Sequence, residues 1–78
     1  MRKLKTLSPA LKYLGGVIRR ERVAKGLTQQ QLAELADLNI RNVQRIEAGE
    51  SDLLLSTTVR LKKVLGVDWD DLLPKEWV

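Results

Sequence analysis

The sequence of 78 residues contains no cysteine and no histidine. Without cysteine the chain has no disulfide framework, no thiolate nucleophile and no thiolate metal site, and a reducing cytoplasm fits this composition. Without histidine, it also lacks the side chain that most often serves as a general base. So short a chain leaves little protein to enclose a ligand pocket of about 300 Å³ or more. We therefore expect a protein that is not an enzyme and has no cofactor.

Long apolar runs are also missing. None approaches the roughly 20 apolar residues of a membrane-spanning helix. The N-terminal stretch MRKLKTLSPALKYL is basic, but it lacks the apolar core and the small-residue cleavage site of a secretory signal. The hydrophobic fraction of 44% is ordinary for a folded domain. These features predict one small soluble domain with no membrane contact.

The charges are distributed unevenly along the chain. Residues 1–45 contain ten Lys and Arg residues against three acids, a net charge of +7. Residues 46–78 contain four basic residues against seven acids, a net charge of −3. A basic half attracts polyanions. This asymmetry predicts that one face of the protein binds a polyanion and that another face has a different role.

Helical spacing of the apolar residues predicts an all-α fold with five helices. Each predicted helix begins at a residue that can cap an N-terminus: Ser8, Thr28, Asn39, Ser56 and Asp68. Residues typical of helix ends follow four of them: Gly26, Gly49, Gly66 and Pro74. The second helix is predicted to end near Asp37. The three leucines of residues 53–55 stand alone and are predicted to fill the core from a loop.

Only Asp37 and Leu38 separate the second predicted helix from the third, so the two helices must cross steeply, as a helix-turn-helix pair does. That crossing needs a small residue at the contact, a position we assign to Ala33. When Val43 and Ile46 face the core, the rotation of about 100° per residue turns other side chains outward. The outward side chains are Ile40, Arg41, Gln44 and Arg45.

This outward face suits a DNA major groove. An α-helix fits the groove, and Arg pairs with guanine while Asn or Gln pairs with adenine, each pairing being worth about 1–3 kcal/mol of discrimination. Gln29 begins the second helix, where its amide and the free backbone N–H groups can hold a phosphate. Single Arg and Gln residues on a helix are usually only solvated, so the prediction depends on the whole pattern. Arg19 and Arg20 are more simply interpreted as such a solvated face.

The stretch LGGVIRRERVAKGLTQQQLAELADLNIRNVQRIEAGE, residues 14–50, resembles the Cro/phage-repressor, or Xre, type of helix-turn-helix DNA-binding domain. Its motifs are Leu-Gly-x-x-Ile-Arg-x-x-Arg, Lys-Gly-Leu-Thr-Gln, Leu-Ala and Ile-Glu-x-Gly, which are specific as a set and weak alone. The resemblance extends over about residues 14–73 and implies a compact five-helix lambda-repressor-like domain. Residues 1–13 are then an N-terminal extension, and residues 74–78 are a C-terminal tail.

The resemblance also implies which residues contact double-stranded DNA. Phosphate contacts correspond to the start of the second helix, and base-reading positions correspond to the third helix. The predicted DNA-binding residues are Thr28, Gln29, Asn39, Ile40, Arg41, Asn42, Gln44 and Arg45.

Two structural features follow from the same resemblance. Arg22 and Glu47 are expected to form an ion pair that joins the first helix to the third. Asp37 stands where the family often has glycine, so a positive φ is expected there, and Asp tolerates this better than most residues. The Asp cluster within residues 68–71 is explained more simply by helix capping than by metal binding, so no metal site is expected.

The family dimerises through its fifth helix and the preceding loop. The implied interface consists of Val67, Trp69, Leu72 and Leu73. Trp69 fits an ordinary core position nearly as well, and Trp77 is a candidate to cover the same surface. A two-fold homodimer would place its third helices about 34–36 Å apart on a pseudo-palindrome.

The resemblance implies a transcriptional regulator, either a repressor or a controller protein, that occupies an operator and blocks RNA polymerase or contacts it from an adjacent site. The alternative is an antitoxin, with a toxin chain as its partner, or another protein-interaction module of the same fold. Gln29, Arg41 and Arg45 occur together on the basic half of the chain, which favours the DNA-binding interpretation.

Overall fold

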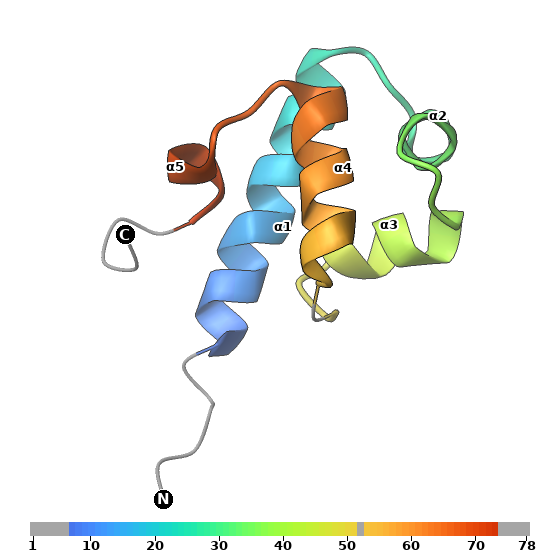
Figure 1. The fold of residues 1–78 in the computed structure, drawn as a ribbon. Coiled ribbons are helices and arrows are strands. Elements are labelled where there is room, and N and C mark those ends of the chain that lie inside the picture. Colours follow the sequence, from blue (N-terminus) through green and yellow to red (C-terminus); the bar gives the residue numbers. More distant parts are fainter. Residues whose placement is uncertain (1–6, 52, 74–78) are drawn as a thin grey trace, which may run out of the picture.

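The computed structural model describes residues 7–51 and 53–73, which form five helices and no strand (Figure 1). The helices are α1 (Leu7–Ala24), α2 (Gln29–Leu35), α3 (Ile40–Glu47), α4 (Leu55–Leu65) and α5 (Trp69–Leu72). The prediction of an all-α, five-helix fold is confirmed.

Helix α1 is the longest element and contacts α3, α4 and α5. In Figure 1 it runs beside α4, with α2 and α3 on one side of this pair and α5 on the other. Helix α2 packs against α3. The α2–α3 pair therefore lies at one side of the domain, held there mainly by the contact of α3 with α1.

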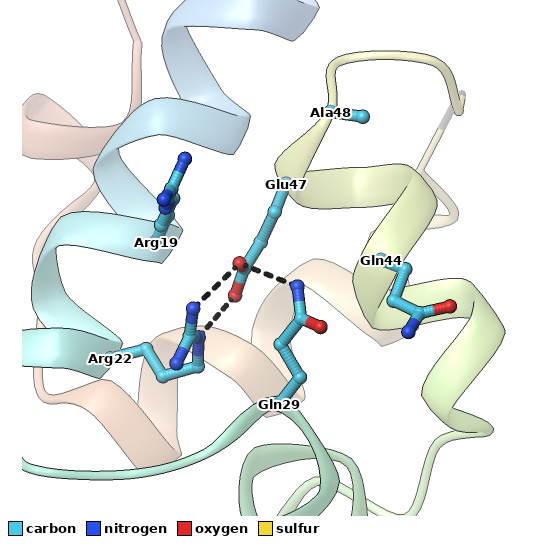
Figure 2. Close-up of a pocket in the computed structure, with 6 residues that line it drawn as sticks. All are labelled: Arg19, Arg22, Gln29, Gln44, Glu47 and Ala48. Carbon is cyan, nitrogen blue, oxygen red and sulfur yellow. Dashed lines mark hydrogen bonds and ion pairs between the residues drawn. The ribbon is translucent and has the colours of Figure 1, made fainter.

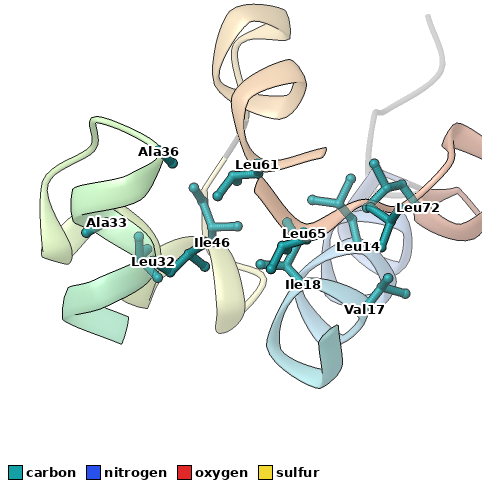
Figure 3. Packing of buried hydrophobic residues seen from close by; sticks show 12 residues of the cluster. Leu14, Val17, Ile18, Leu32, Ala33, Ala36, Ile46, Leu61, Leu65 and Leu72 are labelled. Carbon is teal, nitrogen blue, oxygen red and sulfur yellow. The ribbon is translucent and has the colours of Figure 1, made fainter. Parts of the chain in front are cut away.

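Side chains from all five helices meet in one apolar core (Figure 3). Its members are Leu14, Val17, Ile18, Leu32, Ala33, Ala36, Val43, Ile46, Leu61, Leu65, Val67 and Leu72. Burial of a Val, Leu or Ile side chain stabilises a fold by about 1.5–3 kcal/mol. Ala33 is only 1% exposed, as expected for the small residue at the contact between α2 and α3.

Most of the predicted caps are confirmed. The Thr28 hydroxyl accepts a hydrogen bond from the Gln31 backbone N–H at 3.0 Å, and the Gln31 side chain accepts one from the Thr28 backbone N–H at 2.8 Å. Asn39 Oδ1 accepts from the Arg41 backbone N–H at 2.8 Å. The Asp68 backbone N–H donates to the Asp71 carboxylate at 3.3 Å. The helix ends predicted at Gly26, Gly49 and Gly66 are also confirmed, since α1, α3 and α4 end just before these glycines, whose φ values are 70°, 73° and 68°.

Two predicted helix starts are wrong. Helix α1 begins at Leu7, so Ser8 lies inside its first turn and is not the N-cap. Helix α4 begins at Leu55, with Leu54 at its N-cap, so Ser56 also lies inside the helix. The backbone carbonyl of Leu54 accepts a hydrogen bond from the Thr58 hydroxyl at 3.1 Å, within the first turn of α4.

The prediction that all three leucines of residues 53–55 fill the core is also wrong. Leu53 is half-buried against the core, whereas Leu54 and Leu55 are each 72% exposed. The core-facing residues of α4 are Thr58, Leu61 and Leu65, and neither Leu54 at the N-cap nor Leu55 at the start of the helix adds a buried side chain to them.

The first residues of α1 belong to the folded part of the chain. Residues 7–13, predicted as part of an N-terminal extension, form the beginning of α1, and Ala10 is buried. The predictions for Pro74, Trp77 and the tail of residues 74–78 fall outside the described residues. Over the part of the chain that the structure describes, no helix has the length and apolar character needed to cross a membrane.

Candidate nucleic-acid interface

The turn between α2 and α3 has the predicted backbone conformation. Asp37 has a φ of 57°, the only positive value among the described residues other than glycine. The Leu38 backbone N–H donates to the Ala33 carbonyl oxygen at 2.8 Å, which closes the end of α2. The short turn thus fixes the direction in which α3 leaves α2.

Arg60 of α4 supports this turn from outside. Its Nη1 donates to the Asp37 backbone carbonyl at 2.9 Å and to the Ala36 carbonyl at 3.4 Å. The last carbonyl groups of a helix lack partners within the helix and need external donors. No sequence pattern predicted this contact, because Arg60 is distant in sequence and one of several basic residues of α4.

The outer face of α3 presents two arginine side chains. Val43 and Ile46 are buried at 1% and 2% exposure, and the helical rotation places Arg41 and Arg45 roughly 160° around the helix from Val43. Both arginines are exposed. Within residues 7–51 and 53–73, neither guanidinium group has a hydrogen bond or an ion pair. Their donors are therefore directed outward and available to a ligand.

The other predicted contacts on α3 differ in exposure. Gln44 and Asn42 are exposed and flank the two arginines on opposite sides of the helix. Ile40 is partly buried and packs against the core, so only part of its side chain is accessible. Thr28 and Asn39 are exposed, but their side-chain oxygens already cap α2 and α3.

A largely buried ion pair joins α1 to α3 (Figure 2). Arg22 Nε donates to Glu47 Oε2 at 2.7 Å, and Arg22 Nη2 donates to Glu47 Oε1 at 3.1 Å. A third donor, Arg22 Nη1, binds the Leu27 carbonyl oxygen at 2.7 Å. The side chains of Arg22 and Glu47 are only 12% and 4% exposed. The predicted pair is confirmed, and its burial makes it a strong constraint on the position of α3.

Gln29 extends this cluster to α2. Its Nε2 donates to Glu47 Oε1 at 3.1 Å. Because an ionised carboxylate only accepts hydrogen bonds, Glu47 fixes the orientation of the Gln29 amide and leaves the second N–H of that amide for another acceptor. In Figure 2 the Gln29 carbonyl oxygen lies on the side of Gln44. One carboxylate therefore connects the three helices at the edge of the α3 outer face.

A shallow pocket of about 360 Å³ opens over this cluster. It is lined by Arg19, Arg22, Gln29, Gln44, Glu47 and Ala48. Two of its lining residues, Gln29 and Gln44, are predicted DNA contacts, so the pocket belongs to the same surface as the outer face of α3.

The four predicted dimer residues separate into two groups. Val67 and Leu72 are core residues, at 6% and 1% exposure, and have almost no surface to offer a partner. Leu73 is half-buried. Trp69 is 41% exposed, and Lys62 Nζ lies 5.7 Å from the centre of its ring. The accessible part of the predicted interface is therefore Trp69 with Leu73.

Comparison with known proteins identifies this arrangement. A family model described as helix-turn-helix matches residues 18–72, which include the α2–α3 pair and most of the apolar core. The chain belongs to the helix-turn-helix family. The predicted membership in the Xre, lambda-repressor-like type is thereby confirmed. A search among curated proteins found no match.

The helix-turn-helix chain is also similar to a solved structure, that of the restriction-modification controller protein C.AhdI from Aeromonas hydrophila. The two sequences are 32% identical, and the TM-score is 0.74. The match covers 80% of this chain and 94% of that chain. Together with the family match, this similarity identifies the helix-turn-helix protein as a DNA-binding transcriptional regulator.

Proposed function

We propose that the protein is a sequence-specific regulator that binds a pseudo-palindromic operator as a homodimer and acts as a repressor or controller protein. The observation that carries the proposal is the pair of exposed arginines on α3. Arg41 and Arg45 extend from the side of α3 opposite its buried residues and make no side-chain hydrogen bond within the described residues. Free guanidinium groups on such a helix suit guanine bases in a major groove.

In this proposal each part of the surface has its own role. Arg41 and Arg45 bind base edges, and Asn42 and Gln44 extend the contacts on either side of them. Gln29 donates its second amide N–H to a backbone phosphate that borders the groove. The Arg22–Glu47 pair keeps α3 fixed on α1 and does not contact bases. Phosphate contacts position the protein, and base contacts specify the sequence.

The controller setting has specific support. The similar solved structure, with a TM-score of 0.74, is that of a restriction-modification controller protein, and the match covers 94% of that protein's chain.

We infer a homodimer because two copies double the number of base contacts and give the two-fold symmetry that a pseudo-palindrome mirrors. Trp69, which is 41% exposed, is the proposed anchor of the interface.

Selection of bound duplexes from a random pool tests this function directly. We expect a motif with two-fold symmetry whose half-sites are centred about 10–10.5 bp apart, as two α3 helices on one DNA face require. A recovered motif without two-fold symmetry would contradict operator binding by a homodimer. If no sequence were enriched, the function as a sequence-specific regulator would be wrong, and a protein-interaction module would be favoured.

A further inference from the structure

Two consecutive arginines on α1, Arg19 and Arg20, have different environments. Arg20 Nε donates to the Glu21 carboxylate at 3.2 Å, and the Arg20 side chain is 64% exposed. Arg19 is also exposed, but among the described residues its side chain has no hydrogen bond or ion pair. Of the two, Arg19 alone lines the pocket that contains Gln29 and Gln44. The cation of Arg20 has a local partner, whereas Arg19 lines the pocket and its cation has no partner among the described residues.

The charge balance of the pocket favours an anion. Glu47 is the only acid among the described residues that line it, but this carboxylate is 4% exposed and receives two hydrogen bonds from Arg22 and one from Gln29. Arg22 and Glu47 therefore neutralise each other. The formal charge that remains at the pocket is the single positive charge of Arg19.

The donors around the pocket suit a phosphate group. The Arg19 guanidinium group has five N–H donors in a planar arrangement that matches phosphate oxygens. Gln29 has one amide N–H that is not used by Glu47, and the exposed Gln44 side chain contributes another amide. In Figure 2 Arg19 on α1 lies on one side of the Arg22–Glu47 pair, and Gln29 and Gln44 lie on the other side.

The position of the pocket relative to α3 indicates which phosphate it would receive. Gln44 adjoins Arg45 in sequence and lies on the flank of α3, between the buried stripe and the outer arginines. When the outer arginines enter a major groove, the DNA strand that borders the groove passes this flank. We propose that Arg19 binds a backbone phosphate of that strand over the pocket, so that α1 contributes directly to DNA binding. This inference rests on the proposed DNA-binding function.

The experiment compares Arg19→Ala with Arg20→Ala, which removes the same charge from the adjacent position. Binding is measured at several salt concentrations on the selected operator and on an unrelated duplex. We expect Arg19→Ala to weaken binding of both duplexes about tenfold or more, and to lower the slope of log K against log salt by about 0.9 per bound chain. Arg20→Ala should change both quantities much less. Arg19→Lys should restore most of the slope, because the charge is retained.

Equal slopes for Arg19→Ala and Arg20→Ala would overturn the inference, since Arg19 would then contribute only to the general charge. A loss confined to the operator would also overturn it, because a phosphate contact carries no sequence information. The proposed function is assessed separately by the preference of the unaltered protein for the operator over the unrelated duplex. If that preference were absent, the regulator function would fail, while a lower slope for Arg19→Ala would still support the phosphate contact.

Discussion

Gly15 of α1 lies directly against the backbone carbonyl oxygen of Ile46 in α3. A Cβ atom at residue 15 would overlap that oxygen and would lie 3.1 Å from the Glu47 carbonyl oxygen. The adjacent Gly16 has no atom within 4 Å of the corresponding position. Two neighbouring glycines therefore differ in role, because only Gly15 permits the close contact that seats α3 on α1.

We expect Gly15→Ala to destabilise the protein and Gly16→Ala to stabilise it. Alanine is favoured over glycine in a helix by about 1 kcal/mol, and Gly16→Ala gains this without a steric clash. At Gly15 the added methyl group meets backbone atoms, and overpacking of this kind costs about 1–3 kcal/mol or more. Urea unfolding of the two variants measures the difference. Equal stabilisation of both variants would show that α1 and α3 do not approach this closely.

The buried ion pair should be far more sensitive than an exposed one. Glu47→Ala leaves the Arg22 side chain, which is 12% exposed, without its carboxylate partner. Loss of one partner of a buried pair costs about 3–5 kcal/mol. Glu21→Ala is the matched control, since it removes the carboxylate that pairs with the 64% exposed Arg20 and should cost about 0–1 kcal/mol. Thermal unfolding that showed the same small loss for both variants would contradict the structural role of Glu47.

Much of the fold and part of the site could be predicted from local sequence patterns. Capping residues such as Thr28 and Asn39 act on their own turn, so their roles are visible in the sequence. The position of Ala33 follows from the short connection between two amphipathic helices, whereas the positive φ of Asp37 was expected from the resemblance to the family. The outward position of Arg41 follows from the period of the helix once the buried stripe is known.

The contacts that were not predicted are those between distant segments. Arg60 reaches the end of α2 from α4, and Gln29 of α2 shares the Glu47 carboxylate with α1. Periodicity shows which face a side chain occupies, but not which carbonyl or carboxylate a long side chain reaches. The start of α4 was misplaced for a different, local reason. The Leu54 carbonyl receives its hydrogen bond from Thr58, so the helix begins before the capping residue predicted at Ser56.

Arg60 should affect both the stability of the protein and its DNA binding, because it holds the turn between α2 and α3. Arg60→Ala removes the donor to the Ala36 and Asp37 carbonyls, at a cost of about 1 kcal/mol for these partly exposed hydrogen bonds. A less constrained turn should also lower the affinity for every duplex. Lys63→Ala on the same helix is the control, since Lys63 is exposed and has no side-chain partner in the described segments. If unfolding and DNA binding were identical for the two variants, Arg60 would not fix the turn.

Arg41 should determine sequence preference and not only affinity. Arg41→Ala removes a base contact, so binding of the selected operator should weaken by about 1–3 kcal/mol and the preference at one base pair should relax. Fluorescence anisotropy with the operator and its single-base variants measures both effects. A uniform loss on all duplexes would indicate that Arg41 contacts phosphate instead of bases.

Gln29, in contrast to Arg41, should affect the affinity for DNA and not the sequence preference. Its amide lies at the edge of the site and not on the outer face of α3. Gln29→Ala should weaken every duplex by a similar factor and leave the base preference unchanged. The loss of its hydrogen bond to Glu47 also has to be separated from the loss of a DNA contact. Unfolding of the variant without DNA provides this control, and a loss restricted to the operator would contradict the phosphate role.

Trp69 should determine the assembly state. Its side chain is 41% exposed beside Lys62, and a tryptophan at the centre of an interface often contributes most of the binding energy. Trp69→Ala should shift the mass measured by sedimentation from dimer toward monomer. It should also weaken operator binding, because a monomer contacts only one half-site.

Leu35→Ala is the control for Trp69→Ala. Leu35 is 61% exposed on α2, which lies across the domain from α5 in Figure 1, so truncation of its side chain should leave the mass unchanged. A dimer that persists in Trp69→Ala would place the interface on another surface.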